Sequence, residues 1–187
     1  QPYLPSLEAR GGIFESKGLG WLPSEEVAYA LGVLGLSELG KLFVLGADVV
    51  EKHDDPAVVQ PTYRVAGVYQ VIHRKNPDRF GRIAAMLGLT EAGTRRLATN
   101  EFKTNIPRGK LLRLHAVLDS RVSKERVVAL FRKKAAELDF LDLPEWWVQL
   151  TSNINFGNPR IMFDPHQVYV SQNDAGTQVS IAFFLDE

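Results

Sequence analysis

Side chains that could perform chemistry are densest between residues 48 and 55 of this 187-residue chain. Four carboxylates and one histidine gather there: Asp48, Glu51, His53, Asp54 and Asp55. Carboxylate oxygens are the ligands that Mg²⁺ and Mn²⁺ prefer, and a neighbouring histidine or glutamate can activate water. The group therefore predicts Glu51, His53, Asp54 and Asp55 as catalytic residues, with Asp54 and Asp55 also as metal ligands. Because both aspartates stand directly before a proline, a solvated loop that starts a helix is the alternative interpretation.

Two other histidines fall on predicted helices. His73 is followed by Arg74 near the end of a helix over 62–75, where cations suit the helix dipole. His115 shares a predicted helical face with three leucines, Leu111, Leu114 and Leu118. This pattern is typical of a core histidine whose polar atoms are satisfied.

Charge is segregated along the chain although the formal net charge is zero. Residues 64–134 hold 17 of the 22 Lys and Arg but only 5 of the 22 Asp and Glu, so the two flanks together are acidic. A basic block of this kind favours a nucleic-acid partner, here DNA. The alternative is that basic helices lie against the acidic flanks as their solvated complements. The predicted DNA-binding residues are Arg74, Lys75, Arg79, Arg82, Arg95, Arg96, Lys103, Arg108, Lys110 and Arg113.

Residues 82–97 resemble a helix-turn-helix within this basic block. Gly88 permits a tight turn, Thr90 can cap the second helix, and Leu97 anchors it. Arg95 and Arg96 would then lie on the helix that such motifs place against DNA. An ordinary pair of helices without DNA contact is the alternative interpretation.

Several classes of chemistry are excluded by what the sequence lacks. The chain has no cysteine, which excludes disulfides, thiolate metal sites and thiol nucleophiles. No Walker-type phosphate loop is present. No apolar run reaches the roughly 20 residues of a membrane-spanning helix, so we expect no membrane insertion and a cytoplasmic location.

The pattern of hydrophobic residues predicts one α+β domain over 1–187. Its basic helical middle covers about 62–140, and a β part with a C-terminal hairpin covers about 160–187, completing a small mixed sheet. The predicted helices span 25–34, 62–75, 77–87, 110–120 and 124–138. A buried strand is predicted over 42–45, and a loop over 151–160.

The segment Gly93-Thr94-Arg95-Arg96, together with the chain from its opening Pro2-Tyr3-Leu4-Pro5-Ser6 onward, resembles the Osa-type plasmid fertility inhibition factors. The resemblance implies a ParB/sulfiredoxin-like fold, ATP binding and hydrolysis, and DNase activity. It also implies that DNA transfer through type IV secretion is blocked, with coupling or transfer components as partners. Arg96 would be catalytic and, with Arg95, would bind the nucleotide.

Three hypotheses of function follow. The leading one is a DNA-binding, nucleotide-regulated DNase with ATPase activity and a possible Mg²⁺ or Mn²⁺ requirement. The second is a non-enzymatic regulator or partition protein that reads DNA through its helix-turn-helix, as a dimer. The third is an adaptor whose charge blocks inhibit a protein partner.

Overall fold

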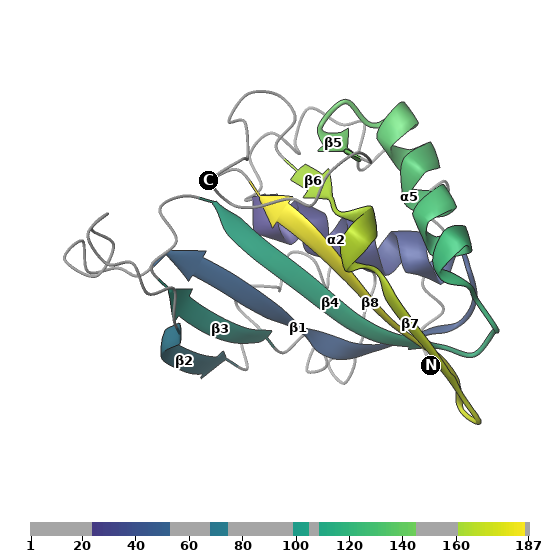
Figure 1. Cartoon of the computed structure of the whole chain (residues 1–187), viewed down its shortest axis with the longest axis horizontal. Coiled ribbons are helices and arrows are strands. Elements are labelled where there is room, and N and C mark those ends of the chain that lie inside the picture. The colour runs from purple at the N-terminus through teal and green to yellow at the C-terminus, as the bar shows by residue number, and fades with distance from the viewer. Residues whose placement is uncertain (1–23, 53–67, 75–98, 105–108, 145–160, 186–187) are drawn as a thin grey trace.

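A computed structural model describes residues 24–52, 68–74, 99–104, 109–144 and 161–185. These residues form an eight-stranded mixed sheet with helices on one face (Figure 1). The elements in chain order are α2 (Ser24–Ser37), β1 (Leu42–Lys52), β2 (Val68–Arg74), β3 (Thr99–Thr104), β4 (Lys110–Leu118), α5 (Lys124–Glu137), β5 (Leu141–Asp142), β6 (Ile161–Phe163), the 3₁₀ turn η4 (Pro165–Gln167), β7 (Tyr169–Asn173) and β8 (Gly176–Leu185).

The strand order is β2-β3-β1-β4-β8-β6-β5, and β7 also pairs with β8. The β1–β3 and β5–β6 pairs are parallel, whereas the other pairs are antiparallel. The long strands β1, β4 and β8 form the middle of the sheet (Figure 1). Segments far apart in the sequence are therefore side by side at its centre.

Helix α2 packs against the sheet with almost its whole surface buried. After its first turn, which carries Glu25 and Glu26, it is largely apolar on all sides, which is typical of a helix inside a core rather than on a surface. Helix α2 lies very close to the sheet at Gly32, where an added Cβ would be 2.9 Å from Leu114 Cδ2 and 3.1 Å from Phe183 Cε2. The sheet face under α2, called the inner face below, packs against the helices to form the hydrophobic core.

Helix α5 covers the same face beside α2. Its N-cap is Ser123, whose hydroxyl accepts a hydrogen bond from the Arg126 backbone N–H, as expected of a serine in this position. Phe131 stacks on Phe163 with 4.3 Å between ring centroids and meets the edge of Phe183. The predicted helix over 124–138 is thereby confirmed, as is the helix that begins near residue 25.

The prediction of a helical middle is wrong wherever the structure describes that segment before α5. Part of the predicted helix over 62–75 is β2, the predicted helix over 110–120 is β4, and β3 lies between them. In β4 the residues at even positions from Leu112 to Leu118 are fully buried and the odd ones are half-buried. This alternation is the period of a strand, and leucines at 111, 114 and 118 concealed it because they also fit a helical period.

The remaining predictions are confirmed in part. The short strand over 42–45 is the start of the longer β1, and β7 and β8 pair across a turn with Asn173 opposite Gly176. However, β8 also pairs with β4 and β6, so the predicted hairpin belongs to the large sheet. The coarse α+β class is thus confirmed. The predicted helix over 77–87 and the loop over 151–160 lie outside the described residues, as does the helix-turn-helix over 82–97. No described helix is long and apolar enough to cross a membrane.

Candidate active site on the outer face of the sheet

The sheet face opposite α2, called the outer face below, carries polar side chains at the centre of the sheet. Side chains alternate along a strand, so Arg113 and His115 of β4 point away from the buried leucines beside them. Asp48 of β1 lies opposite Arg113 and also opposite Asn100 of β3. Three strands that are distant in sequence therefore bring these four polar residues onto one surface.

Asp48 and His115 form a hydrogen-bonded pair. The distance from His115 Nε2 to Asp48 Oδ2 is 2.9 Å, and Asn100 Nδ2 donates to Asp48 Oδ1 at 2.9 Å. Both carboxylate oxygens are thus engaged, which fixes the plane of the carboxylate. The side chains of His115 and Asp48 are 33% and 31% exposed, so the pair is held in place yet reachable from solvent.

A β-bulge lies directly beside this pair. The β1–β4 register shifts between Val44 and Gly46, and Gly46 is the residue opposite His115. Gly46 has a φ of 148°, in the region that favours glycine. Bulges bend a strand and re-aim its side chains, and they are frequent beside active sites. Next to this irregularity, Asp48 reaches His115 diagonally across the strand pair.

Arg113, two residues before His115, is the cation of this surface. Its Nη2 donates to Gln167 Oε1 at 2.5 Å, and its guanidinium carbon lies 5.5 Å from the centre of the Tyr169 ring. Gln167 is in η4, whose N-cap Asp164 accepts a hydrogen bond from the His166 backbone N–H. The arginine is therefore fixed by two neighbours in a position flanking the histidine.

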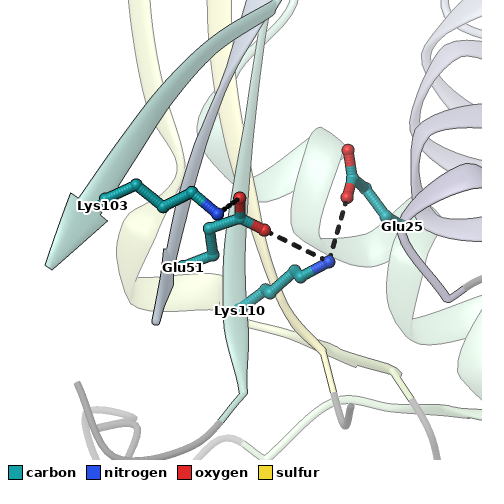
Figure 2. Close-up of polar contacts among 4 residues, drawn as sticks. All are labelled: Glu25, Glu51, Lys103 and Lys110. Carbon is teal, nitrogen blue, oxygen red and sulfur yellow. Dashed lines mark hydrogen bonds and ion pairs between the residues drawn. The ribbon is translucent and has the colours of Figure 1, made fainter. Parts of the chain in front are cut away.

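The inner face carries a second polar group, the buried charge cluster formed by Glu25, Glu51, Lys103 and Lys110 (Figure 2). Glu51 Oε1 lies 2.5 Å from Lys103 Nζ, and Glu51 Oε2 lies 3.3 Å from Lys110 Nζ. Lys110 Nζ also lies 3.5 Å from Glu25 Oε2 at the start of α2. The cluster thus ties α2 to three strands.

Burial raises the pKa of the Glu51 carboxyl, but the hydrogen bond with Lys103, the charge of Lys110 and their further interactions together lower it below its ordinary value. Glu51 is therefore ionised at neutral pH and held by two cations. Because Glu51 is three residues after Asp48 along β1, the two carboxylates point to opposite faces of the sheet.

The structure brings together few of the residues predicted from the sequence. Glu51, Lys103 and Lys110 share the buried charge cluster, Arg113 lies on the outer face, and Arg74 is at the end of β2. Other predicted site residues lie outside the described parts of the chain: His53, Asp54, Asp55, Lys75, Arg79, Arg82, Arg95, Arg96 and Arg108. Their predicted roles remain predictions.

His115 was misassigned by the helical interpretation of its segment. Leu114 and Leu118 point to the inner face, whereas His115 points to the outer face and is not a core residue. The signal that could have found it was the run Leu112, Leu114, Ala116 and Leu118, a two-residue period that leaves His115 and Arg113 together on the other side.

Neither a metal site nor a known relative adds to this picture. Within the described residues, no group of three or more His, Cys, Asp or Glu side chains could hold a metal ion. No protein-family model and no curated protein matches the chain.

Proposed function

We propose that the protein is a phosphodiesterase that cleaves DNA, with His115 as its general base and Asp48 as the residue that positions the His115 ring. The observation that carries this proposal is the 2.9 Å hydrogen bond between His115 Nε2 and Asp48 Oδ2 on a solvent-reachable surface flanked by Arg113. Histidine is the side chain best suited to move a proton near neutral pH. A guanidinium suits the charge and geometry of a phosphate.

The tautomer of His115 follows from its partner. A carboxylate can only accept, so His115 Nε2 carries a hydrogen and its Nδ1 is left as an acceptor. Nδ1 can take a proton from water as the water oxygen attacks phosphorus. The P–O ester bond to the leaving group then breaks, the leaving oxygen takes up a proton from solvent water, and the His115 imidazolium returns its proton to solvent. Asp48 is a positioning residue that holds the ring and stabilises the imidazolium form.

DNA is the proposed substrate because of the charge of the sequence and the resemblance to the plasmid fertility inhibition factors. ATP binding, ATPase activity and a block of transfer through type IV secretion belong to the same proposal. They rest on the resemblance, since Gly93 to Arg96 lie outside the described residues. Cytoplasmic DNA is the substrate that this role requires.

Incubation with supercoiled plasmid tests the proposal, with and without ATP, and with Mg²⁺, Mn²⁺ or a chelator. We expect the wild-type protein to nick or linearise the plasmid under at least one condition, and His115→Gln to be slower by about 100-fold or more. Arg126→Ala, which removes an exposed cation from α5, should cleave like wild type. An intact plasmid under all conditions, or a His115→Gln variant as fast as wild type, would refute the proposal.

A further inference from the structure

Tyr169 is the exposed aromatic residue of the outer face. Among the described residues it is one of two large hydrophobic residues that are exposed, with 55% of its surface accessible to solvent. It lies opposite Ser180 of β8, and Ser180 lies opposite His115 of β4. Directly opposed residues of antiparallel strands share a face, so Tyr169 and His115 lie in one row across the sheet.

The ring of Tyr169 is exposed, and its position is fixed by a neighbouring arginine. The Arg113 guanidinium lies 5.5 Å from its centre, in the range of a cation–π contact, and Gln167 fixes the other end of that guanidinium. Holding both planar groups beforehand reduces the entropy that binding a planar ligand would cost. Arginine planes and tyrosine rings are two kinds of surface on which proteins stack nucleobases.

The separation between Tyr169 and His115 fits a nucleotide. Neighbouring strands lie about 4.7–4.9 Å apart, so two strand spacings place the backbone of Tyr169 about 10 Å from that of His115. One nucleotide with its flanking phosphate bridges such a span. The negative phosphate would then lie near Arg113 and His115, and the base would lie against the ring.

We infer that Tyr169 and Arg113 form a stacking platform for an unpaired nucleobase, so that the outer face binds single-stranded polynucleotide in preference to duplex. This inference rests on the proposed function and adds its substrate class. Bases inside a duplex are stacked on one another and cannot lie on a flat sheet, whereas an unpaired base can be turned onto it.

The test is fluorescence anisotropy with the full-length His115→Gln protein, which keeps DNA intact. The probes are a fluorescein-labelled twelve-nucleotide oligo(dT) and its duplex with oligo(dA). We expect the single strand to bind at least about tenfold more tightly than the duplex. Adding Tyr169→Ala should weaken single-strand binding by about 5- to 100-fold, because one stacked base is lost. Adding Tyr169→Phe, which keeps an aromatic ring, should leave the affinity for the single strand within about twofold of that of His115→Gln alone.

Arg126→Ala, introduced in the same background, is the matched control. It removes one positive charge from α5, which covers the inner face. We expect Arg113→Ala in this background to weaken single-strand binding more than Arg126→Ala does, because Arg113 is part of the platform. Equal losses would indicate general charge attraction and overturn the platform. Equal affinities for single strand and duplex, no binding of either, or unchanged binding by a folded Tyr169→Ala variant would also overturn it. If the wild type cleaves no DNA yet Tyr169→Ala weakens single-strand binding, the platform stands and the proposed hydrolysis fails.

Discussion

Glu51 is a single carboxylate that contacts two lysines, Lys103 and Lys110. Its side chain is 9% exposed, and the side chains of Lys103 and Lys110 are 10% and 19% exposed. Removing one partner of a buried ion pair leaves the other charge uncompensated in a poorly solvated place. We expect Glu51→Gln to lower the free energy of unfolding by about 3 kcal/mol, measured by urea unfolding at pH 7. Asp139→Asn, at an exposed position just after α5, should change it by less than about 0.5 kcal/mol.

The same carboxylate makes that difference depend on pH. Because the folded protein lowers the pKa of Glu51 below 4.5, the unfolded chain binds the proton more readily. The stabilisation by Glu51 is complete above about pH 4.5 and is lost as the pH falls through the lower pKa of the folded state. The gap between wild type and Glu51→Gln should therefore shrink below pH 4.5. A gap as wide at about pH 3 as at about pH 7 would show that ionisation of Glu51 contributes nothing.

Individual residues of the candidate site could be predicted only in part from the sequence. The sequence places Asp48 among the side chains that could perform chemistry and predicts Arg113 as a cation for DNA, and the structure brings both to the outer face. Their relation to His115 and Asn100 was not predictable, because it arises from the register of three strands, and register depends on long-range pairing. A one-residue slip of β4 would move His115 to the inner face.

At the scale of elements, the β7–β8 turn depends on Gly176. Its φ is +133°, and an added Cβ would overlap the Leu118 carbonyl oxygen of β4. Both the strained backbone and the clash with rigid main chain oppose any side chain here. We expect Gly176→Ala to lower the melting temperature strongly, corresponding to about 3 kcal/mol or more, measured by thermal circular dichroism.

Gln178→Ala, two residues further along β8 at an exposed position, is the control and should melt within a few degrees of wild type. A Gly176→Ala variant with the same melting temperature as Gln178→Ala would mean that the turn can shift to accommodate a side chain. The orientation of the hairpin on the sheet would then not depend on this close approach.

Elements with local signals were predictable, and elements without them were not. Helix α5 was found because its apolar stripe, which includes Phe131 and Ala135, has the 3.6-residue period of a helix and is a local feature. In contrast, β2 and β4 were predicted as helices. Their leucines and valines fit both periods, and it is pairing with β3, β1 and β8 that makes them strands.

At the scale of the whole molecule, lysines of the basic block contact carboxylates of the acidic N-terminal flank. Lys103 and Lys110 of the basic block contact Glu51 and Glu25, and Lys134 Nζ lies 3.0 Å from Glu38 Oε1. These lysines lie against the acidic flanks, as the alternative interpretation expected, but they do so as buried pairs, and Lys103 and Lys110 belong to strands rather than to solvated helices. They are engaged inside the protein, so the net basic excess of 64–134 overstates what DNA can contact. Arg113, on the outer face, does not belong to this set.

The central claim is that Asp48 and His115 act as one unit in cleaving a phosphodiester bond. The most direct measurement is a double-mutant cycle of cleavage rates on a labelled single-stranded oligonucleotide, using wild type, Asp48→Asn, His115→Gln and the double variant. Residues that act as a unit are strongly non-additive, so the double variant should be no slower than His115→Gln alone, at about 100-fold or more below wild type. Losses that multiply in the double variant, or single variants as fast as wild type, would contradict the claim.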